Sequence, residues 1–496
     1  MTATRREWIG LATIALPCVL YSMDLTVLDL AVPSLTADLR PTSVQLLWIS
    51  DIYGFVVAAS LIPMGALGDC YGRRRVLLIG AALFGGCSVV AAFARTASVL
   101  IGARAMLGLG GATLAPSTLS LIRSMFSNDN ERRTAIGIWI ASYSVGAAVG
   151  PLVGGLLLER LWWGSVFLPG VAVMALLLIA GPRLLPEYRD PQAKPPDLFS
   201  AVLSFASVFF IVYSVKETTL GGGAISSLGA LVAGVAAGVV FVRRQRTLAY
   251  PLIDLGLFRD AAFTGPLIVY TLGTFVLFGI YFFTAQYLQL VLGLSPLHAG
   301  LSTVPFAFAF IAGSALTPRI AASMRRGSLI VGGLLLSALG FVVLALATMT
   351  HGLTIVIAAF VIYSLGLAPV FTLCTDVIIG AAPPERAGAA AAISETGSEL
   401  GGALGIATLG SIGTALFKDG LAHAPARVTS SLANGAAATL GEVMNVVTQL
   451  PIAAGSALKD LATGSFTLAL RVDALVCAAI VIVAVLGTAK VLRDVQ

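Results

Sequence analysis

Four carboxylates lie inside long apolar stretches of this sequence: Asp24, Asp51, Glu395 and Glu399. A charged side chain at the depth of a bilayer costs about 2.5 kcal/mol or more unless it faces a polar cavity or a partner. Burial favours the neutral form of a carboxyl group, so such a group can bind a proton near neutral pH or, when ionised, pair with an organic cation. These residues therefore indicate a site for two competing ligands. A structural carboxylate held by neighbouring hydroxyls or an arginine is the alternative.

The spacing of these acids decides which of them share a helix face. Glu395 and Glu399 are four residues apart and lie on one face. Asp24 and Asp29 are separated by roughly 140° around a straight helix, so we expect only one of them to face a given cavity. We choose Asp24, because Asp29 lies nearer the outer end of its span and Pro33.

Arg104 is a basic residue well inside an apolar stretch, between Val99 and Ile122. An intramembrane guanidinium needs a partner, either a carboxylate or backbone carbonyls freed near Gly108 to Gly111. As a permanent charge it could change the proton affinity of an acid that moves close to it. A fixed structural ion pair is an equally good interpretation.

Two glycine-containing segments carry further patterns. The loop from Gly65 to Arg75 joins two apolar stretches and must lie at the aqueous surface, because lipid cannot accept irregular backbone. Its candidate residues are Gly65, Asp69, Gly72, Arg73 and Arg74. A second segment has small residues at every fourth position, which permits close helix contact, and a proline that bends the span. It comprises Gly146, Gly150, Pro151, Gly154 and Gly155.

Aromatic side chains offer a candidate substrate cavity. Phe275, Phe278 and Tyr281 lie with Gln289 in one apolar region, and Tyr53 lies two residues after Asp51. Aromatic faces attract organic cations. The alternative is that these side chains face lipid, as aromatic residues in membrane spans commonly do.

Composition places all these residues in an all-α polytopic membrane protein. The chain has 496 residues, of which 58% are hydrophobic and 11% charged, with a mean hydropathy of +0.96. About fourteen apolar stretches are long enough to span a bilayer at ~20 residues each. They begin near Gly10, Leu46, Val76, Val99, Ala135, Val166, Leu198, Ile225, Phe263, Ala299, Leu329, Leu353, Ala389 and Phe466.

Arginine and lysine cluster in alternate connections, and this asymmetry predicts orientation. The basic set includes Arg5/Arg6, Arg73 to Arg75, Arg132/Arg133, Arg243/Arg244/Arg246, Arg325/Arg326 and Lys490/Arg493. These connections, and both termini, are expected in the cytoplasm, with the chain in the cell membrane. The net charge of +6 is then explained by the membrane orientation and by contact with anionic lipid. No basic tract in the sequence indicates nucleic-acid binding.

The sequence lacks the motifs of several other functions. It has no P-loop lysine motif, HExxH or GxSxG, so ATP-driven pumping and intramembrane hydrolysis lack residues to perform them. The five cysteines have neither disulfide nor metal-site spacing. We therefore expect no enzyme activity, no metal and no cofactor, with a proton gradient as the energy source.

An internal repeat suggests two bundles. The segment after Arg73 to Arg75 reappears after Arg325 and Arg326, which aligns the third span with the eleventh. This predicts a six-helix bundle over residues 1–190, an inserted helix pair over 191–250 and a second bundle over 251–496. The long connection 418–465 within the second bundle is expected outside the cell, either as a helical hairpin or as a disordered loop.

These motifs resemble those of the major facilitator superfamily, in particular its fourteen-span drug/proton antiporters. Gly65 to Leu77 is similar to the family's cytoplasmic-loop signature, with Cys70 at a commonly basic position, and Gly146 to Gly155 to the fifth-span signature of its exporters. Leu100 to Ala112 resembles the fourth-span signature around a membrane arginine, with Leu107 at the usual glutamine. The resemblance implies that Asp69 and Arg73 help set the inward/outward equilibrium and that Arg104 takes part in proton transfer.

The resemblance also extends to the acid-bearing spans. Met23 to Leu28, Leu47 to Tyr53 and Ser394 to Gly401 look like the first, second and thirteenth spans of pumps for quaternary ammonium compounds, dyes and fluoroquinolones. Ala299 to Pro318 lacks the further acid of some such pumps. The implied function is proton-coupled multidrug efflux of lipophilic, mostly monovalent cations such as ethidium and acriflavine, by a monomer using alternating access. The alternatives are export of a non-cationic antibiotic or lipid, with the acids serving protons only, and, more distantly, a receptor or membrane enzyme.

Overall fold

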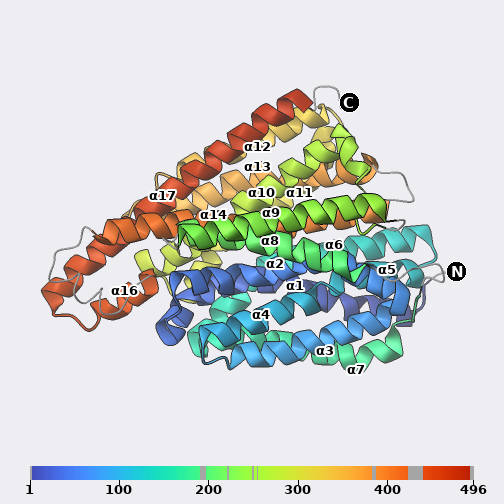
Figure 1. Ribbon diagram of the computed structural model, residues 1–496, viewed down its shortest axis with the longest axis horizontal. Helices are drawn as coiled ribbons and strands as arrows, with labels where there is room; N and C mark the ends of the chain where they lie inside the picture. Colours follow the sequence, from blue (N-terminus) through green and yellow to red (C-terminus); the bar gives the residue numbers. More distant parts are fainter. Residues whose placement is uncertain are drawn as a thin grey trace.

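The computed structural model is almost entirely helical and describes residues 3–189, 197–219, 223–248, 251–253, 255–381, 387–422 and 439–491. Its long helices run alongside one another in a bundle (Figure 1). The α-helices are α1 (Arg5–Leu39), α2 (Ser43–Tyr71), α3 (Arg73–Ala92), α4 (Ala97–Gly111), α5 (Leu114–Met125), α6 (Asp129–Arg160), α7 (Leu168–Leu184), α8 (Leu198–Thr219), α9 (Ala224–Thr247), α10 (Ala261–Gln286), α11 (Pro296–Ala321), α12 (Arg326–Leu344), α13 (Gly352–Ala381), α14 (Ala387–Ala422), α16 (Leu440–Val447) and α17 (Ile452–Val491). Short 3-10 turns η1 (Trp163–Phe167) and η2 (Leu257–Arg259) precede α7 and α10, and a π-helical turn η3 (Tyr287–Val291) extends α10.

The number of membrane spans follows from helix length and hydropathy. Twelve helices within the described residues are long and apolar enough to cross a membrane. α1 provides a thirteenth, although it bends by 47° between Asp24 and Thr26. α8 has a shorter apolar stretch, Leu198–Ser214. The all-α, multi-span class is therefore confirmed, while the count of fourteen stays a prediction that depends on α8.

Local sequence signals account for several helix ends. The Thr42 hydroxyl accepts from the Gln45 amide, and the Gln45 side chain accepts from the Thr42 amide, so a reciprocal capping box starts α2. Gly72 ends α2 with φ at +108°, a conformation that favours glycine, and α3 starts at the next residue. Asp260 caps α10 by accepting from the amide of Ala262.

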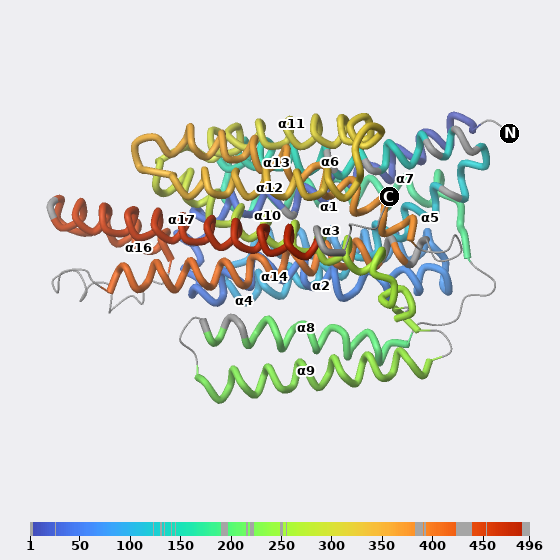
Figure 2. Tube along the Cα trace, turned by 90° about the horizontal axis from the view of Figure 1, so that it is seen from above, coloured from blue at the N-terminus to red at the C-terminus, as the bar shows by residue number. Residues whose placement is uncertain are grey.

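The spans pack in two groups with a peripheral pair. The first group consists of α1 to α7: α1 packs on α6, and α3 packs on both α4 and α7. The second group consists of α10 to α17: α10 packs on α14, and α12 packs on both α13 and α17. α2 contacts α14 and α6 contacts α11, which joins the groups. α8 and α9 run side by side along one flank (Figure 2), where α8 contacts α2 and α14. The predicted boundaries at residues 190 and 250 fall outside the described residues and stay predictions.

The connection before the last span contains a short helix. α16 begins at a capping box formed by Thr439 and Glu442 and lies at the opposite end of the molecule from the two termini (Figure 1). The residues after Pro451 do not form a separate hairpin helix: α17 runs without a break from Ile452 to Val491, and no proline interrupts it. Residues 423–438 of the predicted hairpin lie outside the described residues.

Candidate functional site

Asp24 on α1 and Arg104 on α4 form an ion pair inside the first group of helices. Nη1 of Arg104 donates to Oδ2 of Asp24 at 3.3 Å, and the two residues are 2% (Arg104) and 5% (Asp24) exposed. Nη2 of Arg104 donates to the carbonyl oxygen of Ser50 on α2 at 3.4 Å. The guanidinium therefore has both kinds of partner that we considered, although its carbonyl partner belongs to α2 and not to the Gly108–Gly111 segment.

Tyr53 of α2 lies beneath the same guanidinium. The Arg104 Cζ atom is 5.3 Å from the centroid of the Tyr53 ring, within the range of a cation–π contact. Close packing of α4 on α2 permits this contact, since a Cβ at Gly111 would stand 2.9 Å from the Tyr53 hydroxyl oxygen. The buried charge of Arg104 thus faces a carboxylate, a carbonyl and an aromatic ring.

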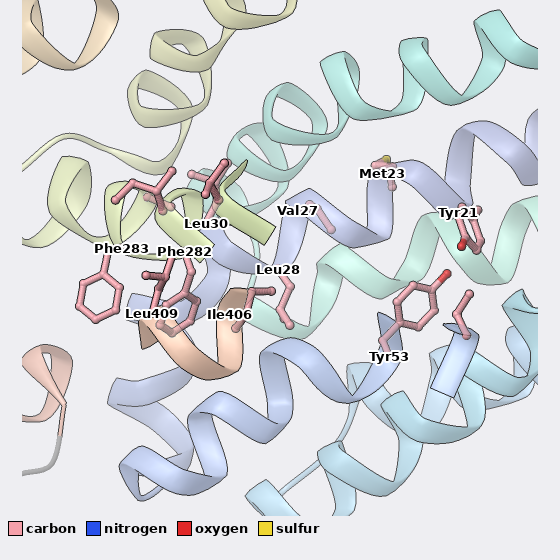
Figure 3. Packing of buried hydrophobic residues seen from close by; sticks show 14 of the residues in the cluster. Tyr21, Met23, Val27, Leu28, Leu30, Tyr53, Phe282, Phe283, Ile406 and Leu409 are labelled. Carbon is pink, nitrogen blue, oxygen red and sulfur yellow. The ribbon is translucent and has the colours of Figure 1, made fainter. Parts of the chain in front are cut away.

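Tyr21 links this region to the second group of helices. Its hydroxyl donates to Oε1 of Glu399 on α14 at 2.6 Å. Its ring lies 6.1 Å from that of Tyr53, centroid to centroid, and Figure 3 shows the two tyrosines next to each other on α1 and α2. A continuous series of contacts therefore runs from Asp24 through Arg104, Tyr53 and Tyr21 to Glu399, and it crosses from one helix group to the other.

Asp51 is buried on the face of α2 that meets α14. It is 2% exposed. Four residues before Asp51, the Leu47 side chain packs against Gly410 of α14. Three residues after Asp51, a Cβ at Gly54 would stand 3.4 Å from Oε2 of Glu399 on α14. Since residues three and four apart share a helix face, Asp51 lies between these two contacts. It is thus close to the interface of the two helix groups.

Glu395 and Asp29 complete the set of acids considered from the sequence. Glu395 is half-buried, one helical turn before Glu399. Asp29 is buried, at 4% exposed, and lies within electrostatic range of Arg104 and Tyr281. Both Asp24 and Asp29 are buried, and α1 bends by 47° just after Asp24. The expectation that only one of them faces a given cavity stays a prediction.

The segment Gly65 to Arg75, predicted as a loop, is helical on both sides of Gly72, because α2 continues to Tyr71 and α3 begins at Arg73. Charged groups hold this segment in place. Nη2 of Arg73 lies 2.5 Å from Oδ1 of Asp69, and Nη1 of Arg73 donates to the Pro116 carbonyl of α5 at 3.2 Å. Arg74 pairs with Glu187, which follows α7, at 3.5 Å. Asp69 thus ties the end of α2 to the start of α3, and the start of α3 is held to α5 and to the residue Glu187, so a displacement of α2 against α3 strains the Asp69–Arg73 pair.

The glycines of α6 face two neighbouring helices. Side chains at Gly146, Gly150 or Gly154 would overlap residues 19–27 of α1, the stretch that contains Asp24. A Cβ at Gly155 would stand 2.7 Å from Cα of Leu297 on α11. This helix therefore packs tightly on the acid-bearing segment of α1 and on the second helix group, where the Pro151 carbonyl lies against Gly300 of α11.

The aromatic candidates lie against different partners. Phe278 packs where a side chain at Gly402 of α14 would stand, whereas Tyr281 stacks on Phe360 of α13 with ring centroids 6.4 Å apart. Nε2 of Gln289 donates to the carbonyl of Leu30 on α1 at 3.0 Å, which bridges the helix groups. Phe275 is half-buried beside Gly405. A shared role in a substrate cavity stays a prediction.

Sequence reasoning missed two buried polar residues. Tyr21 carries the link to Glu399, and no spacing rule distinguishes it from other tyrosines in spans. Asp473 on α17 is fully buried, at 0% exposed. The rule that singled out the other intramembrane acids applies equally to Asp473, which lies in an apolar stretch, so a complete scan of the chain would have found it.

The helix arrangement and the buried charges are those of a multi-span membrane transporter. A solved bacterial homologue of the human lysosomal transporter Spinster, in an inward-facing and unoccupied conformation, superposes with a TM-score of 0.68, 18% identity and 99% of each chain covered. The human organic anion transporter MFSD10 superposes with a TM-score of 0.59, 14% identity, and 98% of this chain and 100% of that chain covered. At these identities the likeness concerns the fold.

The model of the Major Facilitator Superfamily matches residues 14–406, and the chain belongs to this family. It is 44% identical to "Multidrug efflux pump LfrA" of Mycolicibacterium smegmatis, covering 97% of this chain and 95% of that protein. It is 34% identical to "Methyl viologen resistance protein SmvA" of Salmonella typhimurium, covering 93% of each. It is 33% identical to the "Tetracenomycin C resistance and export protein" of Streptomyces glaucescens, covering 82% and 76% respectively. The predicted superfamily is confirmed, and so is the prediction that the chain is a transporter and not an enzyme.

Proposed function

We propose that this chain is a proton-coupled antiporter in the cell membrane that exports lipophilic, mostly monovalent organic cations by alternating access. The names of LfrA and SmvA support multidrug efflux as the general activity. The observation that carries the proposal is the series of contacts from the Asp24–Arg104 pair through Tyr53 and Tyr21 to Glu399. It connects buried carboxylates on the two helix groups that must move relative to each other.

Asp24 is one place where a proton and an organic cation compete. Its ionised form pairs with Arg104, and protonation removes the charge that holds the guanidinium. An organic cation that binds Asp24 also displaces Arg104 from it. Each ligand therefore weakens the other, and by thermodynamic linkage a proton gradient then drives release of the cation.

Glu399 is the second place of competition. It accepts the Tyr21 hydrogen bond across the two helix groups, so this bond must break when α1 and α14 separate. An ionised Glu399 exposed by that separation attracts a cation, and a protonated Glu399 releases it. Moving one elementary charge across a membrane potential of 100 mV is worth about 2.3 kcal/mol. One proton exchanged for one monovalent cation moves no net charge, so transport at this stoichiometry responds to the pH gradient and not to the membrane potential.

The proposed orientation places both termini in the cytoplasm. The arginine-rich connections lie at the end of the molecule where α1 begins, and α16 lies at the opposite end (Figure 1). The positive-inside rule then puts α16 outside the cell. Asp69 and Arg73 lie at the cytoplasmic ends of α2 and α3 in this orientation, where their ion pair, with the bond from Arg73 to the Pro116 carbonyl of α5, favours one arrangement of these helices over the other.

The test is ethidium efflux from proteoliposomes with an imposed pH gradient. The parent chain is expected to transport ethidium in proportion to the gradient, and Asp24→Asn and Glu399→Gln are each expected to lower the rate at least tenfold. Asp376→Asn is the matched control, because the Asp376 carboxylate is exposed and pairs with Arg326 on the surface. Gradient-dependent transport that survives in both Asp24→Asn and Glu399→Gln would contradict the proposal.

A second candidate is export of a non-cationic product, in which the acids bind protons only. The 33% identity to a tetracenomycin C resistance and export protein favours it. In this case the parent chain moves no ethidium under any gradient, while addition of the neutral substrate still discharges a pH gradient. The ethidium assay thus separates the two functions.

A further inference from the structure

A second polar site lies in the half of the molecule toward α16. A pocket there is lined by aromatic side chains of three helices and by several polar side chains. Its lining includes Phe282, Phe283, Gln286, Thr414, Phe417 and Phe466. The α2 residues Leu46 and Leu47 and the first residues of α16 close it on the other sides. The pocket therefore lies between the two helix groups, away from Asp24 and Arg104.

The aromatic rings of this pocket form a connected group. Phe283 stacks on Phe466 with ring centroids 5.1 Å apart, and Phe417 meets Phe466 edge-on at 5.9 Å. Phe282 contacts Phe283 at 5.5 Å. Figure 3 shows Phe282 and Phe283 beside Leu409 of α14, well separated from Tyr21 and Tyr53. Such a wall suits a flat, delocalised organic cation, because aromatic faces attract positive charge.

A buried acid lies directly behind this wall. Asp473 of α17 and the ring of Phe283 both occupy the space where a side chain at Gly413 of α14 would stand. Phe283 thus lines the pocket and also lies against Gly413 of α14, where Asp473 lies. Phe466, which lines the pocket, precedes Asp473 by two helical turns on α17 and lies on the same side of the helix.

Within the described residues, Asp473 has no hydrogen bond that would explain it as a structural residue. In the part of the chain that the structure describes, neither of its carboxylate oxygens has a hydrogen-bond partner, and its residue is 0% exposed. The neighbouring Arg471 donates instead to the Ala347 carbonyl at 2.7 Å. A buried acid without a partner destabilises the fold in either protonation state, so an apolar residue would be better tolerated if packing were its only role.

We propose that Asp473 and the pocket lined by Phe283, Phe417 and Phe466 form a second binding subsite for lipophilic organic cations, at the α16 end of the pathway. In the arrangement seen here, the ring of Phe283 lies between Asp473 and the pocket. When Phe283 turns away and the pocket opens, Asp473 ionises and holds the cation before its release. This inference rests on the proposed cation export, because it assigns a second stop to the same substrate class.

The experiment places a reporter cysteine in the pocket. Thr414 is half-buried on the pocket wall, so Thr414→Cys in proteoliposomes is labelled with a membrane-impermeant maleimide, with and without ethidium. The parent chain with its native cysteines gives the background. Ethidium is expected to slow labelling of Thr414→Cys at least threefold, and adding Asp473→Asn or Phe466→Leu is expected to abolish this protection.

Asp460→Asn is the matched control, because Asp460 is an exposed carboxylate on the same helix. When Asp460→Asn is added to Thr414→Cys, ethidium should slow labelling as much as it does in Thr414→Cys alone. Phe466→Leu keeps the test informative if Asp473→Asn does not fold. Protection that persists in both pocket variants, or no protection although ethidium efflux is intact, would overturn the subsite. Absence of ethidium efflux in the parent chain would instead overturn the proposed function.

Discussion

The hydroxyl of Tyr21 on α1 lies 2.6 Å from Oε1 of Glu399 on α14, and these two helices belong to different helix groups. The bond joins a neutral donor to a buried carboxyl group at the interface that alternating access must open. It therefore connects the protonation state of Glu399 with the relative position of the helix groups.

Tyr21→Phe should weaken this connection. Leaving Glu399 without its donor costs about 1–3 kcal/mol, which should lower the thermal unfolding temperature and make transport less dependent on pH. Differential scanning fluorimetry and ethidium efflux across a pH series measure the two effects. Tyr363→Phe is the matched control, since within the described residues the buried Tyr363 hydroxyl has no hydrogen-bond partner. A Tyr21→Phe variant as stable as this control would show that the bond contributes nothing.

The Asp24–Arg104 pair should behave as a unit. Removing one partner leaves an uncompensated buried charge, which costs about 3–5 kcal/mol. Asp24→Asn and Arg104→Gln should therefore each destabilise the protein more than the double variant does. A double-mutant cycle in thermal unfolding measures this coupling. Strictly additive effects would mean that the two side chains act independently.

The packing of α6 on α1 gives a prediction with an internal control. A methyl group at Gly146 would overlap the backbone of Val19, so Gly146→Ala should displace α1 and lower both stability and transport. Nothing lies within 4 Å of a Cβ at Gly137 on the same helix. Gly137→Ala should raise stability by up to about 1 kcal/mol, because alanine favours helix. Equal effects of the two substitutions would argue against close α1–α6 packing.

The α8–α9 pair is held at one end by an ion pair outside the membrane. The Arg244 guanidinium beside Asp197 lowers the pKa of that carboxyl to about 2. A carboxyl group with a lowered folded-state pKa stabilises the fold above its unfolded value of about 3.9, and this contribution is lost as pH falls toward the folded value. The unfolding temperatures of the parent and Asp197→Asn should thus differ by a constant amount above about pH 5 and converge below pH 4. A difference that grows on acidification would contradict the assignment.

Much of the fold could be predicted from residue patterns alone. Long apolar stretches must form helices in lipid, so the all-α class followed from solvation energetics, as did the need of Arg104 for a buried partner. The choice of Asp24 as that partner could not be predicted from spacing. The placing of Asp24 and Asp29 on different sides of α1 assumed a straight helix, and residue spacing gave no sign of the 47° bend that lies between them. The Tyr21–Glu399 bond joins residues 378 positions apart, and no local pattern predicts which donor meets which acid across two helix groups.

The most direct test of the central claim is reciprocal coupling. Proteoliposomes that contain the parent chain and a trapped pH indicator are given an ethidium gradient and no pH gradient. Antiport predicts proton movement opposite to ethidium movement, absent in Glu399→Gln and retained in Asp376→Asn. Ethidium movement without proton movement in the parent chain would contradict proton-coupled exchange.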